Sequence, residues 1–247
     1  MNPAIIIPAY NPDHSLPAYI RQLRQQGNLR IIIVDDGSAF PLKPIFDSIR
    51  GIEGCTVLTH GRNMGKGAAL KTAFRHVWEQ CEEVTHVITA DADGQHTADD
   101  VIRVTRETVK SARGLVLGVR DFIHPDIPGR SLFGNRLTSR LFKMLFGTRL
   151  NDTQTGLRGI PRREIRWLMT IRGERYDYEM NSLIHAVRED VEIREVGIRT
   201  IYLDDNASSH YRPVQDSVRI FLKIISGYFN GRSLYVSSAE REFAEET

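Results

Sequence analysis

The stretch RIIIVDDGS, residues 30–38, joins a run of aliphatic residues directly to two aspartates and a glycine. A run this apolar is typical of a strand that is covered on both faces of a parallel sheet. Four more strands of this kind are predicted at AIIIPAY (4–10), CTVLTH (55–60), HVITADADG (86–94) and GLVLGVR (114–120). Helical spacing recurs between them at residues 16–26, 42–50, 66–81 and 98–112. This alternation predicts an α/β fold with an open, mostly parallel, doubly wound sheet and helices on both faces.

The pattern changes after residue 121. We expect a basic helix at 130–146, a turn-rich link at 151–161, a helix at 175–190, a strand at 193–203 and an amphipathic helix at 213–229. No repeat or linker divides the chain. We therefore expect one domain over residues 1–235, followed by an acidic, flexible tail at 236–247.

Composition limits the classes of function. The net charge is +2, from 33 basic and 31 acidic residues, which disfavours broad nucleic-acid binding. Cys55 and Cys81 have no metal-binding spacing, so reduced thiols in a cytosolic protein are preferred to a single disulfide. The longest apolar helix candidate, 218–229, is short and contains Arg219 and Lys223. We expect a soluble protein, or one that at most lies on a membrane surface.

Polar residues follow four of the predicted strands. They are Tyr10 and Asn11, the segment 35–38, the segment 91–95, and Arg120. Ligands of open α/β sheets bind beyond the carboxyl ends of the strands. One crevice at that edge is expected to collect all four groups.

Asp91 and Asp93 form the candidate metal site. If the strand continues to their position, both side chains point the same way and converge on one cation. Gly94 permits a sharp turn that brings Gln95 or His96 close. Oxygen ligands of this kind suit Mg²⁺ or Mn²⁺. The alternative is a solvated loop or a helix cap, the role expected of Asp99 and Asp100.

The segment HGRNMGKGAALKTAF (60–74) is rich in glycine but matches neither the Walker loop nor the dinucleotide fingerprint. It predicts a helix that is entered through a glycine turn. Lys66 and free backbone N–H groups at such a helix start can also meet an anion.

Together, PAYN (8–11), VDDGS (34–38), NMGKGAAL (63–70) and DADGQ (91–95) resemble the motif series of inverting family 2 glycosyltransferases with a GT-A fold. The motifs GVR (118–120) and DTQTGLRG (152–159) are similar to those of dolichol- or polyprenyl-phosphate sugar synthases. The resemblance covers about residues 4 to 210. It implies transfer of a sugar from a nucleotide-diphosphate sugar to a polyprenyl phosphate, on the cytoplasmic side of the membrane.

The resemblance also implies roles for individual residues. The nucleotide-sugar site comprises Pro8, Ala9, Tyr10, Asn11, Val34, Asp36, Lys66, Asp91, Ala92 and Asp93. Asp93 and Gln95 contact the metal, with Asp91 beside them nearer the sugar-nucleotide. Arg120 matches the arginine associated with phosphate binding near the reaction centre. Arg130 and Arg136 come from the basic stretch at 130–149 and are assigned with Arg120 to the acceptor phosphate.

Two departures from the family pattern leave the donor open. Pro12 replaces the glutamate that usually follows PxYN. The R-x-Y-G-x-S-K segment appears as LDDNASSHYRP (203–213), in which Ser209, His210 or Arg212 are candidate substitutes.

The acceptor decides whether a base is needed. A lipid phosphate arrives ionised and needs arginines to position it, whereas a hydroxyl acceptor needs a carboxylate base. Asp152, Asp177 and Glu179 are the candidates, and Asp152 is grouped with Asp91, Asp93 and Arg120 as catalytic. The stretch 130–149 contains five basic residues and no acidic one. In a helix, one face carries Arg136, Arg140 and Lys143 and the next carries Leu137, Leu141 and Leu145. The stretch suits an interfacial helix beside anionic headgroups or a channel for a lipid phosphate; the alternative is an ordinary solvated face over a core stripe.

Other functions are less consistent with the sequence. A glycan or protein hydroxyl remains the alternative acceptor. Processive synthesis is disfavoured because Arg163 stands where QxxRW requires glutamine. A non-catalytic nucleotide-sugar binding module would require a broken metal motif, and DADGQ is intact.

Overall fold

The computed structural model describes residues 2–120 and 129–199, with the side chains of 129–134 left out. The strands are β1 (Pro3–Ala9), β2 (Arg30–Asp35), β3 (Cys55–Thr59), β4 (His86–Thr89), β5 (Leu115–Arg120), β6 (Arg158–Pro161) and β7 (Ile193–Ile198). The helices are α1 (Leu16–Gln25), α2 (Lys43–Arg50), α3 (Lys66–Gln80), α4 (Ala98–Thr108), α5 (Gly129–Phe146), α6 (Ile165–Thr170) and α7 (Asp177–Arg188). Short 3₁₀ turns cover Phe40–Leu42 and Arg162–Glu164.

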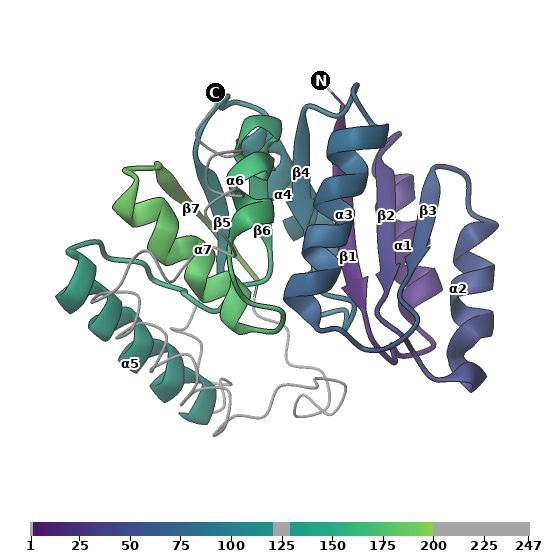
Figure 1. The fold of residues 1–247 in the computed structure, drawn as a ribbon, viewed down its shortest axis with the longest axis horizontal. Helices are drawn as coiled ribbons and strands as arrows, with labels where there is room; N and C mark the ends of the chain where they lie inside the picture. Colours follow the sequence, from purple (N-terminus) through teal and green to yellow (C-terminus); the bar gives the residue numbers. More distant parts are fainter. Residues whose placement is uncertain (1, 121–128, 200–247) are drawn as a thin grey trace.

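The strands form one seven-stranded sheet in the order β3-β2-β1-β4-β6-β5-β7 (Figure 1). β6 is antiparallel to both of its neighbours, and every other pairing is parallel. The prediction of an open, mostly parallel α/β sheet is confirmed.

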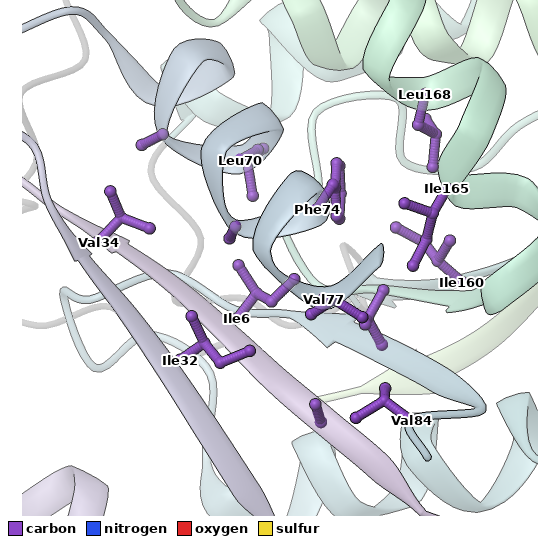
Figure 2. Close-up of a cluster of buried hydrophobic side chains, with 14 of the residues drawn as sticks. Ile6, Ile32, Val34, Leu70, Phe74, Val77, Val84, Ile160, Ile165 and Leu168 are labelled. Atoms are coloured by element: carbon purple, nitrogen blue, oxygen red, sulfur yellow. The ribbon is translucent and has the colours of Figure 1, made fainter. Parts of the chain in front are cut away.

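Two apolar clusters cover the two faces of this sheet. Ile6 and Ile32 point into a cluster with α3, where Figure 2 shows them facing Phe74 and Val77. Their neighbours along β1 and β2 point the other way, into a cluster formed with α1, α2 and α4. Because successive strand residues alternate between faces, a strand buried on both sides must be apolar throughout. This explains the uninterrupted IIIV run at residues 31–34.

Two predicted strands end earlier than expected. β2 stops at Asp35, and β4 stops at Thr89, two residues before Asp91. Beyond β4 the Asp91 N–H donates to His96 Nδ1, and the Gln95 N–H donates to Asp93 Oδ1. Gly94 has a φ of 76°, which reverses the chain. The acidic pair therefore lies in a turn, and the prediction that a continuing strand aligns both aspartates was wrong.

The prediction of a link over residues 151–161 was also wrong at its end. Residues 158–161 form β6, which lies between β4 and β5. The strand is only four residues long and ends in proline, so it has too few residues for a periodic signal. The following short helix, α6, was not predicted.

Helix α5 forms where the basic stretch predicted it, but its buried face differs. Asn135, Thr138 and Phe142 are buried, whereas Leu137 is 46% exposed. Phe142 packs in a third cluster with α7, and Leu141 and Leu145 lie at its margin. The basic side chains at 136, 140 and 143 are exposed. The buried face of α5 therefore includes the polar residues Asn135 and Thr138, which form hydrogen bonds with the loop at 151–153.

Some predictions fall on residues outside the described ranges. These are the helix at 213–229, the segment 203–213 with Ser209, His210 and Arg212, the tail at 236–247 and the side chain of Arg130. The single-domain assignment remains a prediction. Both cysteines are free. Within the described part of the chain, we find no helix of the length and hydropathy that a membrane span requires.

Candidate active site

The parallel strands β1, β2, β4 and β5 end at one edge of the sheet, so the polar groups that follow them share that edge. The first two groups are bonded to each other. The Asn11 N–H donates to Ser38 Oγ at 2.9 Å, and the Ala39 N–H donates to Asn11 Oδ1 at 2.9 Å. These bonds fix the turns after β1 and β2 as one unit.

Asp36 holds the glycine-rich loop against the end of β2. Its buried carboxylate accepts hydrogen bonds from the backbone N–H groups of Met64 (2.9 Å) and Gly65 (2.7 Å). His60 Nδ1 lies 2.7 Å from Asp36 Oδ1. The carboxylate of Asp36 thus holds the loop that leads into α3, and a contact with the nucleoside remains a prediction.

The other residues assigned to the nucleoside pocket divide by exposure. Pro8, Ala9 and Val34 are buried at the ends of β1 and β2. Tyr10 is 37% exposed at this edge of the sheet. A contact of these residues with a nucleoside remains a prediction.

Lys66 joins three elements of the site. It is the first residue of α3, and its ammonium lies 2.6 Å from Asp91 Oδ1 and 3.0 Å from Glu179 Oε1. Asp91 follows β4 and Glu179 lies on α7. The anions that Lys66 meets in this structure are therefore two carboxylates of the chain itself.

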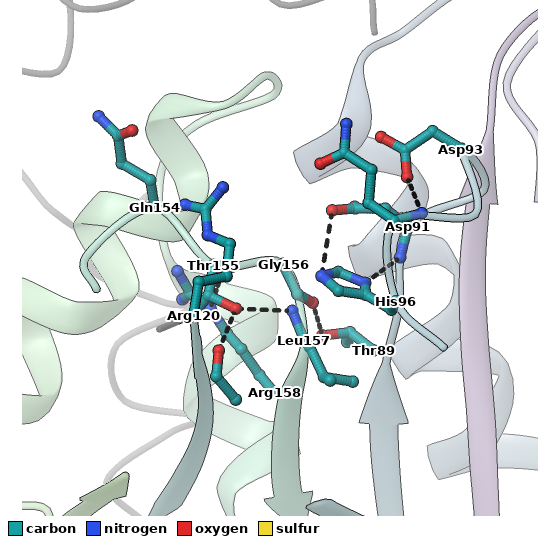
Figure 3. Close-up of polar contacts among 12 residues, drawn as sticks. Thr89, Asp91, Asp93, His96, Arg120, Gln154, Thr155, Gly156, Leu157 and Arg158 are labelled. Atoms are coloured by element: carbon teal, nitrogen blue, oxygen red, sulfur yellow. Dashed lines mark hydrogen bonds and ion pairs between the residues drawn. The ribbon is translucent and has the colours of Figure 1, made fainter. Parts of the chain in front are cut away.

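Figure 3 shows the two aspartates of the DAD motif, with Asp91 beside His96. Their electrostatic environments differ. Burial alone would raise the pKa of Asp91, but the positive charges of Lys66, His96 and Arg120 outweigh it and lower the pKa to about 2. Burial and the adjacent charge of Asp91 raise the pKa of Asp93 to about 6. Asp91 is satisfied by its neighbours, whereas the charge of Asp93 is costly.

Gly156 allows the loop before β6 to reach the acidic pair. A Cβ atom at this position would lie 2.5 Å from Asp91 Oδ2 and 2.7 Å from Lys66 Nζ. The Gly156 carbonyl accepts a hydrogen bond from Thr89 Oγ1 at 2.7 Å, as Figure 3 shows. Sequence reasoning found the DTQTGLRG motif but missed this contact, because it assigned the segment to a link.

Arg120 and Asp152 form a two-pronged ion pair at the end of β5. Arg120 Nε donates to Asp152 Oδ2 at 2.7 Å, and a terminal guanidinium nitrogen donates to Oδ1 at 3.0 Å. The Asp152 side chain is fully buried. The structure therefore brings two predicted catalytic residues together, with Asp152 orienting the guanidinium of Arg120.

Arg158 is a buried charge beneath the site that sequence reasoning also missed. Its guanidinium donates to the Glu179 carbonyl at 2.9 Å and to Ser182 Oγ at 3.0 Å. Burial lowers its pKa, while the negative charge of Glu179 opposes that effect. Arg158 thus fixes the α7 turn that carries Glu179.

The donor set fits a divalent cation that also binds phosphate. In residues 2–120 and 129–199 no three His, Cys, Asp or Glu side chains cluster as a closed metal site. Mg²⁺ and Mn²⁺ sites for nucleotides use one or two carboxylates and complete their shell with phosphate and water. Among the described residues no ion pair of Asp93 is found, and burial and the charge of Asp91 raise its pKa, so a cation beside it would stabilise its ionised form. Asp93 and Gln95 are thus suitable ligands.

The model of the family described as glycosyl transferase family 2 matches residues 4–163, about two thirds of the chain. The chain belongs to this family. It is therefore a glycosyltransferase with a GT-A-like fold, as the resemblance implied.

Two relatives show the range of the similarity. The chain is 28% identical over 218 residues to UDP-N-acetylglucosamine--dolichyl-phosphate N-acetylglucosaminyltransferase of Methanococcus voltae, covering 81% of this chain and 86% of the relative. It is 32% identical over 116 residues to undecaprenyl-phosphate 4-deoxy-4-formamido-L-arabinose transferase of Pseudomonas fluorescens, covering 43% and 32% of the two chains.

A solved structure shares the fold. Glucosyl-3-phosphoglycerate synthase from Mycobacterium tuberculosis, in complex with Mn²⁺, uridine diphosphate and phosphoglyceric acid, superposes with a TM-score of 0.68 at 15% identity. The match covers 96% of this chain and 80% of the synthase.

Proposed function

We propose that this glycosyltransferase is metal-dependent and inverting, and that it transfers a sugar from a nucleotide-diphosphate sugar to a polyprenyl phosphate. The relatives named for dolichyl-phosphate and undecaprenyl-phosphate acceptors support the acceptor class. The relative from Methanococcus voltae carries most weight because it matches 81% of the chain.

The donor is expected to bind at the carboxyl edge of β1, β2 and β4. Its base is placed beside Tyr10 and its diphosphate beside Asp93 and Gln95, which would hold Mg²⁺ or Mn²⁺. The cation supplies Lewis acidity that stabilises the negative charge of the departing diphosphate. Asp93 orients that diphosphate through its position in the turn after β4, and the backbone N–H of Gln95 fixes the carboxylate.

The contacts of the candidate catalytic bases favour one class of acceptor over the other. Both oxygens of Asp152 accept hydrogen bonds from Arg120, and Glu179 is ion-paired with Lys66. Carboxylate oxygens that already contact a guanidinium or an ammonium are not open to take the proton of a hydroxyl acceptor. A phosphate monoester is already largely ionised at neutral pH and needs no base. The site is therefore better suited to a lipid phosphate than to a hydroxyl.

The acceptor phosphate is assigned to Arg120, with Arg136 and Arg130 as further contacts. The guanidinium of Arg120 is fixed by Asp152, so it can present a charge without losing side-chain entropy on binding. Exposed basic residues at 136, 140 and 143 of α5 lie beside the exposed Leu137. We propose that this surface makes a peripheral contact with an anionic membrane on the cytoplasmic side.

The proposal is tested by incubating the purified protein with Mn²⁺, undecaprenyl phosphate and a panel of nucleotide sugars that begins with UDP-sugars. A labelled lipid with inverted anomeric configuration supports it. Donor hydrolysis without a lipid product from any donor would contradict the acceptor assignment. A reaction of equal rate in chelator would contradict the metal requirement.

A further inference from the structure

The segment Gly65-Lys66-Gly67 brings α3 unusually close to the chain that leads into α7. A Cβ atom on Gly67 would lie 2.5 Å from Tyr178 Cβ, and one on Gly65 would collide with the Glu174 carbonyl. Gly65 also has a φ of 103°. Only glycine at these two positions allows this close approach. As a result, the ammonium of Lys66, the residue between them, lies beside Glu179 and Asp91.

The ammonium of Lys66 is held from several sides. It forms ion pairs with Asp91 at 2.6 Å and with Glu179 at 3.0 Å. The Tyr176 ring centroid lies 5.9 Å away. The backbone is fixed as well, since the Gly65 N–H donates to Asp36 and the Ala68 N–H donates to the Glu174 carbonyl. Lys66 is thus a rigid positive charge beside one member of the DAD pair.

We propose that Lys66 is a positioning residue that occupies Asp91 and thereby leaves the cation to Asp93. The role of Lys66 rests on the proposed metal role of Asp93. A cation that approached Asp91 would meet a fixed positive charge in direct contact with that carboxylate, and the repulsion is strong at such short range. Glu179 anchors the ammonium and offsets part of its charge.

This arrangement predicts opposite effects for two substitutions. Lys66→Met removes the positive charge and frees Asp91 to join Asp93, so the affinity for Mn²⁺ in the absence of nucleotide should rise about tenfold. Glu179→Gln removes the negative charge that offsets Lys66, so the affinity should fall several-fold. Turnover should decrease in both variants, because in each the acidic pair no longer holds its position.

Lys71→Met is a matched control. Lys71 lies on the same helix, pairs with Glu174 at 2.8 Å, and has a side chain 14% exposed, against 15% for Lys66. Its loss removes an ion pair between α3 and the same loop but leaves Asp91 untouched. The Mn²⁺ affinity of this variant should equal that of the unmodified protein.

The experiment is a Mn²⁺ titration of the nucleotide-free protein, followed by the electron paramagnetic resonance signal of free Mn²⁺, with thermal unfolding to check folding. Tighter binding in Lys66→Met together with weaker binding in Glu179→Gln supports the positioning role. Equal or weaker binding in Lys66→Met overturns it. If that variant does not fold, unchanged or tighter binding in Glu179→Gln overturns it.

The failure of the proposed function would look different. If the unmodified protein binds no Mn²⁺, or if Asp93→Asn binds it as well as the unmodified protein does, then Asp93 is not a metal ligand. In that case the metal-dependent mechanism fails, whatever the behaviour of the Lys66 variant. A merely structural role for Lys66 would lower stability without raising the affinity for Mn²⁺.

Discussion

Gly156 lies directly against the carboxylate of Asp91, close enough that a Cβ atom would approach Asp91 Oδ2 to 2.5 Å. We predict that Gly156→Ala displaces Asp91 and lowers turnover by about 10–100-fold, since a shift of about 1 Å at a reacting centre has effects of this size. Steady-state kinetics measure the loss. Gly197→Ala is the control, because a Cβ there meets no atom of residues 2–120 or 129–199 within 4 Å. Equal activity in the two variants would contradict the contact.

Asp93→Asn should stabilise the metal-free protein at about pH 7.5. The pKa of Asp93 is raised to about 6 by burial and by the charge of Asp91, from an ordinary value of 3.8. The folded state therefore binds the proton more tightly than the unfolded state does, and stability falls as the pH rises from 3.8 to about 6. Asparagine at position 93 carries no charge, so above about pH 6 the variant avoids this loss of stability.

Thermal unfolding in chelator at two pH values tests this effect. The melting temperature of the variant should rise by a few degrees near neutral pH only. In a domain of this size, each kcal/mol of added stability raises the melting temperature by about 2–4 °C. Below pH 3.8 the difference should vanish, because the carboxyl is then protonated in both states. A variant that is less stable near neutrality would show that Asp93 already has a stabilising partner.

Asp36→Asn should destabilise the protein without touching the core. The carboxylate accepts from the N–H groups of Met64 and Gly65, and an asparagine amide would turn an N–H₂ group toward one of these donors. A buried N–H group that faces another donor in place of an acceptor lowers the free energy of unfolding by about 1–3 kcal/mol. Denaturant unfolding measures the change, with Asp47→Asn at an exposed site of α2 as the control. Equal stability of the two variants would show that Asp36 does not hold the loop that leads into α3.

Arg120→Lys should lower kcat/KM for the lipid acceptor by about 100-fold, because lysine cannot reproduce the two-pronged contact with Asp152. The measurement varies the lipid phosphate at saturating donor. Arg106→Lys, at an exposed position of α4, should leave the rate unchanged. A loss confined to the donor KM would instead place Arg120 at the nucleotide.

The sequence predicted the frame of the fold because β1, β2 and β5 carry apolar runs and the short β4 leads directly into the acidic motif. β6 was missed because its sequence RGIP has only one aliphatic residue, and the strand is fixed by its place between β4 and β5. The stripe expected on α5 was partly wrong because Asn135 and Thr138 are buried by hydrogen bonds to the loop at 151–153, which no hydrophobic pattern records.

The site was predictable as a set of residues but not as a set of contacts. Asp91, Asp93 and Lys66 were identified from motifs, yet nothing local in the sequence relates Lys66 to Glu179, which lies more than a hundred positions away. The contact follows from the packing of α3 against the chain before α7. The contacts of Asp36 with the glycine-rich loop were missed for a similar reason, since its partners belong to another loop.

The most direct test of the central claim is the rate of nucleoside diphosphate release, measured with and without polyprenyl phosphate and Mn²⁺, for the unmodified protein and for a folded Asp93→Ala variant. The account predicts rapid release only when lipid phosphate and metal are both present, and none above background in the variant. Release that is unaffected by the lipid, or that persists in Asp93→Ala, would contradict it.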